Sequence, residues 1–308
     1  MKRETPDDAS PAARRGGWLS RRGLLAAPAL ALAGLPTASA APVELKLFLL
    51  AGQSNMAGAD SVLPGSDGLA QIESDRATLF TGTPLSGAAS ADFKPWGSVR
   101  GHKAAKPPYG DRPVIGPEVG FERRLYEAGL RNLALIKVWA NYPRTETVWP
   151  WGEGGALHTR WMNFADERIA ELEAAGYVPK VAGFVWHQGI DDAIHGRFAA
   201  EYLSHVKQMV ADLRRRFRAE QAPFVLARSV NSPLARSITG HGPNDPMAVV
   251  RRLQEAAAKE IPLCGWVDVD DLPNVVQHHF SADSQLIIGR RFGDLYLKLA
   301  ASGSGASR

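Results

Sequence analysis

The residues best suited to chemistry lie where apolar segments of the sequence end. Gly52-Gln53-Ser54-Asn55 follows one apolar run, and His187-Gln188-Gly189 follows another at Val181–Trp186. A third run, Cys264–Val269, leads through several aspartates to His278-His279. A serine hydroxyl attacks an ester carbonyl when a neighbouring base takes its proton. The sequence therefore presents a nucleophile, a base and amide side chains at corresponding points of its elements.

Ser54 is the strongest candidate nucleophile, because Gly52 permits a sharp turn just before it. The alternative interpretation is that Ser54 only caps a helix. Competing motifs are absent. Position 56 is Met, so this is not the G-x-S-x-G elbow of α/β-hydrolases, and neither a phosphate-binding loop nor an H-E-x-x-H motif occurs.

Alternating apolar runs and amphipathic segments predict the elements that hold these residues. Amphipathic patterns predict helices at 118–128, 162–175 and 198–217 and a last helix capped by Ser281, whereas 59–114 and 229–246 are expected to be long loops. Such alternation predicts a parallel sheet covered on both faces, with its ligand site at the carboxyl ends of the strands. The expected strands are 43–51, 133–139, 181–186, 223–227 and 264–269.

The first forty residues read as an export signal. Arg21-Arg22 precedes an Ala/Leu-rich run, and Ala38-Ser39-Ala40 fits a signal-peptidase site, which together predict a twin-arginine signal peptide over 1–40. A general secretory signal or a disordered tail is the alternative. The apolar run is too short and too interrupted by proline to span a bilayer stably. The mature protein is therefore expected in the periplasm or outside the cell.

Charge and cysteine content narrow the function further. The chain has 36 Lys and Arg against 32 Asp and Glu, of which residues 1–40 hold six and three. The mature chain thus has 36 − 6 = 30 basic and 32 − 3 = 29 acidic residues, or +1, which gives no indication of a nucleic acid partner. The single cysteine, Cys264, excludes an intrachain disulfide and a thiolate metal cluster.

Four ordered blocks resemble those of a known family. They are Gly52–Gly58, Ile115–Glu118, Gly183–Gly189 and His279–Phe292, within a resemblance that covers about 43–300. They resemble the sialate O-acetylesterase-like domain, carbohydrate esterase family 6, of the SGNH hydrolases. The resemblance implies a three-layer α/β/α, flavodoxin-like fold with a central parallel sheet over 41–300. We expect 301–308 to be a flexible tail.

The resemblance also implies roles for individual residues. Ser54 would be the nucleophile and His279 the base, with the oxyanion bound by the backbone N–H groups of Ser54 and Gly116 and by the Gln188 amide. The alternative for Gln188 is a buried amide that holds loops together. The implied substrate is an acetylated carbohydrate, and the implied mechanism uses neither a cofactor nor a metal.

The acidic member of the triad departs from the family pattern. The two positions that usually supply it are Val276 and Ile190. Asp191 is our first choice in their place, while Asp192 matches an additional aspartate of the family. A Ser-His dyad is the alternative, and so is a catalytically impaired relative that only binds carbohydrate.

Two further patterns remain open. His187, Asp191, Asp192 and His195 lie within nine positions and could bind a metal ion, but no second segment anchors such a site. Trp149-Pro150-Trp151 could stack on sugar rings, although buried core positions are the more frequent place for tryptophan.

Overall fold

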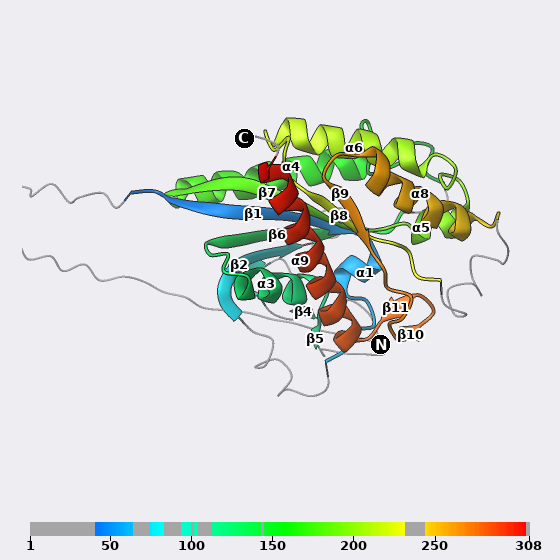
Figure 1. Cartoon of the computed structure of the whole chain (residues 1–308), viewed down its shortest axis with the longest axis horizontal. Coiled ribbons are helices and arrows are strands. Elements are labelled where there is room, and N and C mark those ends of the chain that lie inside the picture. The colour runs from blue at the N-terminus through cyan, green and yellow to red at the C-terminus, as the bar shows by residue number, and fades with distance from the viewer. Residues whose placement is uncertain are drawn as a thin grey trace, which may run out of the picture. The chain divides into compact units, whose positions relative to one another are not determined.

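A seven-stranded sheet organises the computed structural model, in the order β3-β2-β6-β1-β7-β8-β9 (Figure 1). All neighbouring strands are parallel except β3, which is antiparallel to β2 at the edge. The strands are β1 (Val43–Gly52), β2 (Ser74–Gly82), β3 (Lys94–Val99), β6 (Leu133–Trp139), β7 (Tyr177–His187), β8 (Phe224–Ala227) and β9 (Cys264–Val267).

The structure describes residues 41–63, 74–82, 94–99, 102–103, 113–142, 145–231 and 244–305. Pro42–Arg308 forms one compact unit. The predicted signal peptide, 1–40, lies outside the described residues. Within the described ranges, no helix combines the length and the apolar character needed to cross a membrane.

All five predicted strands are confirmed, and they form the centre of the sheet together with one of its edges. The prediction of a long loop over 59–114 is wrong in part, because this segment contributes β2 and β3 to the sheet. The same segment also holds the short pair β4 (His102–Lys103) and β5 (Pro113–Val114).

Helices cover both faces of the sheet, so the predicted three-layer α/β/α fold is confirmed. The alternation of β1 shows the two cores: Leu47 and Leu49 belong to one apolar cluster, and Phe48 and Leu50 belong to the other. On the first side lie α4 (Ala156–Ala174), α5 (Ile190–His195), α6 (Tyr202–Arg216) and α8 (Pro246–Glu260), and on the second lie α3 (Glu118–Glu127) and α9 (Ala282–Gly305).

The helix boundaries refine the predictions. The cap at Ser281 is confirmed, because its Oγ accepts a hydrogen bond from the Ser284 N–H at 3.1 Å. We expected a flexible tail from residue 301, but α9 continues as helix to Gly305. Helix α8 was not predicted, although Asp245 caps it by accepting from Ala248 N at 2.8 Å and Pro246 occupies its first turn.

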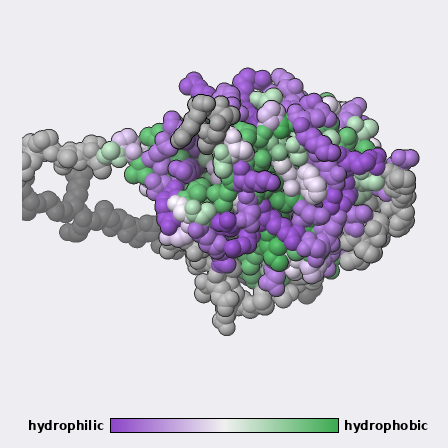
Figure 2. Space-filling model, in the orientation of Figure 1, coloured by the Kyte–Doolittle hydropathy of each residue, from purple (hydrophilic) through white to green (hydrophobic). Residues whose placement is uncertain are grey.

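The tryptophans of the 149–151 loop pack in the core. Trp149 is 2% exposed and Trp151 is fully buried, with its ring edge-on to Trp186 at 5.1 Å. The interpretation of these residues as core residues therefore holds, and they are not available to stack on a sugar. Figure 2 shows that hydrophilic residues dominate the outline of the face drawn, with hydrophobic ones gathered nearer its middle.

One ion pair lies fully inside the second core. Lys137, in the middle of β6, places its Nζ 2.7 Å from Oε1 of Glu118, the first residue of α3, and neither side chain is exposed. Burial lowers the pKa of Lys137, while the nearby Glu118 carboxylate opposes that shift. The two charges compensate each other in a region that otherwise packs apolar side chains.

Candidate active site

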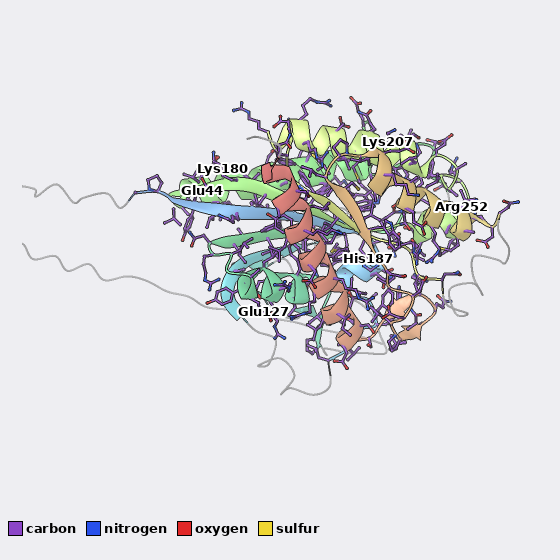
Figure 3. All side chains as sticks on the ribbon, in the orientation of Figure 1. Glu44, Glu127, Lys180, His187, Lys207 and Arg252 are labelled. Atoms are coloured by element: carbon purple, nitrogen blue, oxygen red, sulfur yellow. The ribbon has the colours of Figure 1, made fainter. Side chains whose placement is uncertain are left out.

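The site is built where β1 ends between β6 and β7. Gly52 pairs with Trp139 on one side and with His187 on the other. A Cβ at Gly52 would lie 2.3 Å from the His187 carbonyl oxygen, so the close approach of these two strands requires glycine. Figure 3 labels His187 at this end of the sheet, near α1.

The short helix α1 (Ser54–Ala57) carries the predicted nucleophile. Ser54 is its first residue and is 9% exposed. The N-cap is Gln53, so Ser54 does not act as the helix cap. The helix ends at Gly58 with φ of 84°, where a Cβ would lie 2.0 Å from the Ile115 carbonyl oxygen. Glycine is thus required for the chain to turn back after Ser54 and its helix.

His279 reaches this helix from the other end of the chain. It lies on β11 (His279–Phe280), which pairs with β10 (Asn274–Val276) in a small hairpin. Asn55, next to the nucleophile, donates a hydrogen bond from Nδ2 to the His278 carbonyl oxygen at 3.0 Å. The residues beside the nucleophile and beside the predicted base are therefore bound directly to each other.

The carboxylate that binds His279 is Asp60. Its Oδ2 is hydrogen-bonded to Nδ1 of the imidazole, and both side chains are mostly buried. Asp60 has a left-handed φ of 63°, a conformation that aspartate tolerates better than most residues. The sequence analysis did not identify Asp60. It lies six residues after Ser54 and 219 before His279, so only the folded chain reveals the pair.

Ser61 fixes the turn that carries Asp60. Its fully buried hydroxyl donates to the Gly58 carbonyl at 2.6 Å, contacts the Ile115 carbonyl and accepts from Ile115 N at 3.1 Å. The turn is thereby bound to the segment that holds Gly116.

Asp191 has a different environment from the one we expected. Its Oδ2 accepts from the backbone N–H of Tyr142 at 3.2 Å, and its carboxylate also bonds the side chain of Gln53. The choice of Asp191 as the partner of His279 is therefore corrected to Asp60. The reason is where Asp191 lies. It is in the first turn of α5, and from there its carboxylate binds the loop that follows β6.

Asp192 organises a buried polar cluster beside it. The carboxylate accepts hydrogen bonds from the Tyr142 hydroxyl, from Gln188 Nε2 and, at 3.2 Å, from Trp149 Nε1. Gln188 Nε2 also lies 3.2 Å from the Tyr142 hydroxyl. These contacts give both Asp192 and Gln188 the geometry of residues that hold loops together.

Gln53 completes the link between β1 and α5. Its Oε1 accepts from the backbone N–H groups of Gly189 at 3.0 Å and of Ile190 at 3.1 Å. The residue before Ser54 thus satisfies the free N–H groups at the start of α5.

Burial sets the protonation of several groups at this edge. It raises the pKa of Asp191 to about 7 and that of Asp192 to about 6, because a buried carboxylate loses its hydration. Burial lowers the pKa of both His187 and His278 to about 3. These two imidazoles are therefore neutral at neutral pH.

The predicted oxyanion donors all have acceptors within the chain. The Ser54 N–H donates to Asn141 Oδ1 at 3.2 Å, and the Gly116 N–H donates to Glu118 Oε1 at the same distance. Gln188 Nε2 is directed at Asp192. The side chain that binds the Ser54 N–H is therefore that of Asn141, which sequence reasoning missed.

The residues of the possible metal cluster, His187, Asp191, Asp192 and His195, do not gather around one point in the structure. In the part of the chain that is described, no three His, Cys, Asp or Glu side chains converge so as to hold a metal ion. Asp191 and Asp192 instead serve the hydrogen bonds given above, and His195 is the last residue of α5.

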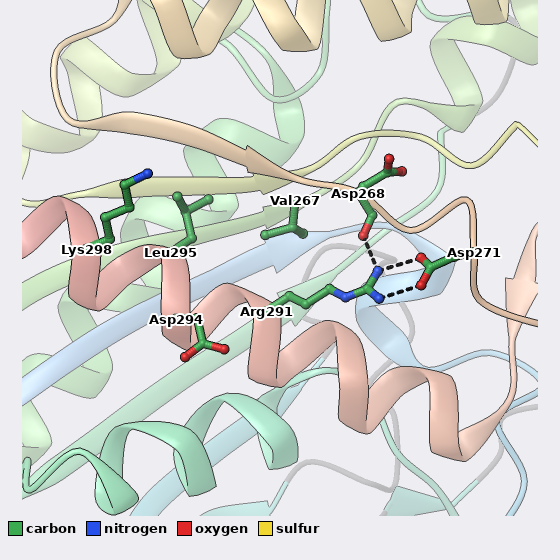
Figure 4. Close-up of a pocket in the computed structure, with 7 residues that line it drawn as sticks. All are labelled: Val267, Asp268, Asp271, Arg291, Asp294, Leu295 and Lys298. Carbon is green, nitrogen blue, oxygen red and sulfur yellow. Dashed lines mark hydrogen bonds and ion pairs between the residues drawn. The ribbon is translucent and has the colours of Figure 1, made fainter.

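A separate surface pocket lies between β9 and α9 (Figure 4). None of its lining residues belongs to the site at α1. Its Arg291 is engaged by both carboxylate oxygens of Asp271, at 2.7 and 2.6 Å, and by the Asp268 carbonyl at 2.6 Å. Arg291 and Asp271 thus pair within this pocket, whereas the carboxylates of Asp294 and Asp268 pair with Arg124 and Arg228, which do not line it.

Comparison with known proteins adds a family. A model described as carbohydrate esterase, sialic acid-specific acetylesterase, matches residues 44–298. Among solved structures, NanS has a TM-score of 0.60 at 15% identity, covering 85% of this chain and 99% of its own. An Arabidopsis thaliana protein and a carbohydrate acetylesterase from Xanthomonas citri both have 0.58 at 17%, covering 83% of this chain and 98% and 57% of theirs. At identities this low, the structural likeness shows a shared fold alone. No curated protein matches the chain.

The raised pKa of Asp191 gives a prediction for stability. Because the pKa of Asp191 in the folded protein, about 7, exceeds the ordinary aspartate pKa of 3.8, the native state holds this proton more tightly between these two pH values. Asp191 therefore lowers stability progressively as pH rises through that window. The variant Asp191→Asn lacks this penalty. We therefore expect its free energy of unfolding, relative to that of the wild type, to rise by on the order of 2–4 kcal/mol when the pH is raised from 4 to 8. Urea unfolding at both pH values measures this, and parallel pH profiles would contradict it.

Proposed function

The chain belongs to the carbohydrate esterase family of sialic acid-specific acetylesterases, and we propose that it hydrolyses acetyl esters of carbohydrates through an acyl-serine intermediate. The observation that carries this mechanism is the Asp60–His279 pair, held against the helix that begins with Ser54. Family membership supports the ester-hydrolase class, and the geometry supports the serine mechanism.

The roles follow from the hydrogen bonds. With Nδ1 bound to Asp60, the imidazole carries its proton there and leaves Nε2 as the acceptor. His279 would take the Ser54 proton as Oγ attacks the acetyl carbon, and would return it to the departing sugar hydroxyl. Asp60 would orient the ring and stabilise its charged form. Water would then release acetate from Ser54 by the same steps.

The oxyanion site is proposed to begin with the Ser54 N–H. This N–H belongs to the first residue of α1, so it is a backbone donor held in place before the reaction. Gly116 would join this site by exchanging its present acceptor, Glu118, whereas Gln188, which the resemblance also implies, would first have to leave the buried carboxylate of Asp192. Their roles are thus part of the proposal.

The alternative of an impaired carbohydrate-binding relative loses its main motivation. It rested on the absence of an acid at positions 190 and 276. Asp60 provides a carboxylate on His279 from elsewhere in the chain, which supports a full triad instead of a Ser-His dyad.

The nucleophile can be tested directly. We expect Ser54→Ala to lower acetate release from an O-acetylated sugar by at least about 10³-fold while the protein stays folded. The measurement is acetate release with and without the substitution, together with circular dichroism. Equal rates for the two proteins would refute the serine mechanism.

The identity of the acid can be tested with a matched pair. We expect Asp60→Asn to lower kcat by about 10²–10⁴-fold, because the amide spoils the orientation and charge stabilisation of the imidazole. Asp191→Asn is expected to stay within about tenfold of the wild type, since it acts on the Tyr142 loop. Initial rates on one acetyl ester measure both. The reverse order of effects would return the acid to Asp191.

We also propose that the chain is exported through the signal at 1–40. Replacing Arg21 and Arg22 together by lysine should leave the precursor inside the cell, because the export receptor reads the arginine pair. Fractionation of a bacterial host with an immunoblot measures this. The N-terminus of the exported form should be residue 41, and unchanged export of the double variant would favour a general secretory signal.

A further inference from the structure

Asn141 lies at a position that bears directly on the reacting atoms. Its Oδ1 accepts the Ser54 N–H at 3.2 Å, which is the hydrogen bond that an acyl oxygen would take during attack by Ser54. Asn141 Oδ1 therefore holds the hydrogen bond that an oxyanion formed on Ser54 would need.

The backbone on both sides of Asn141 is tied down. The N–H of Ala140 donates to the Gly52 carbonyl at 3.0 Å, and the N–H of Tyr142 donates to Asp191 at 3.2 Å. Tyr142 is also held through its hydroxyl by Asp192. The Asn141 side chain itself is exposed, so a fixed backbone presents an amide that can rotate.

We propose that Asn141 is a further catalytic residue, whose amide exchanges roles during the reaction. This inference rests on the proposed serine mechanism. As the bond from Ser54 Oγ to the acyl carbon forms, the carbonyl electron pair moves to oxygen, and the serine proton goes to His279. The new oxyanion takes the Ser54 N–H from Asn141 Oδ1, and the amide turns to donate from Nδ2.

The contacts of Gln188 favour Asn141 over Gln188 in this role. Gln188, the side chain expected in this role, has Nε2 bound to Asp192 and close to the Tyr142 hydroxyl, inside a buried cluster. An exchange by Gln188 would break those bonds to a buried carboxylate, whereas Asn141 gives up one bond to a backbone N–H. The amide with the smaller cost of turning is thus that of Asn141.

Two substitutions separate a donor from a structural contact. Asn141→Asp keeps an oxygen acceptor for the Ser54 N–H but has no N–H to donate, and Asn141→Ala removes both. We expect both to lower kcat by about 10²-fold, with little change in KM or in the thermal midpoint. Asn163→Ala, at an exposed asparagine on α4, is the control and should match the wild type.

Inactivation by a 4-nitrophenyl alkylphosphonate gives a second readout. Its tetrahedral phosphonyl oxygen takes the place of the oxyanion on Ser54, so the inactivation rate should fall in step with kcat. Wild-type rates from Asn141→Asp, or a faster enzyme from Asn141→Ala, would overturn the role of Asn141. Such results would leave the proposed function intact, because that depends on the loss of activity in Ser54→Ala.

Discussion

The close approach of β1 to β7 at Gly52 is the constraint on which the site depends. No other residue fits there, because a Cβ would lie 2.3 Å from the His187 carbonyl. This approach lets the loops that follow β1, β6 and β7 meet, and each then bonds to the next. Gln53 binds the start of α5, Ala140 binds Gly52, and Asp191 binds Tyr142. The side-chain hydrogen bonds at this edge therefore depend on the close approach of the two backbones.

The proposed nucleophile and the proposed acid share one short segment. Ser54 begins α1, and Asp60 lies in the turn that follows it, which Ser61 and the conformation of Gly58 hold in place. Only His279 comes from a distant part of the chain, and the bond from Asn55 to the His278 carbonyl brings it there. The geometry of the proposed triad therefore depends on how one hairpin docks against one helical turn.

The sequence predicted the parts of this arrangement that arise from local pattern. Continuous apolar runs identify β1, β6 and β7, and Ser281 marks the start of α9, because burial and capping leave local signals. Asp245-Pro246 is a local signal of the same kind for the start of α8. Asp60 and Asn141 had none, since each acquires its partner only through tertiary contact. The β2 and β3 strands lie among Gly-, Pro- and Ser-rich segments, which favoured a loop.

The buried Glu118–Lys137 pair has a consequence for how this sequence can change over time. Loss of either partner alone would leave an uncompensated charge inside the protein, at a cost of about 3–5 kcal/mol. A joint replacement by apolar residues would avoid the uncompensated charge, although it would also remove the acceptor of the Gly116 N–H. Either single replacement would therefore destabilise the protein. The two positions are expected to change together among descendants of this chain.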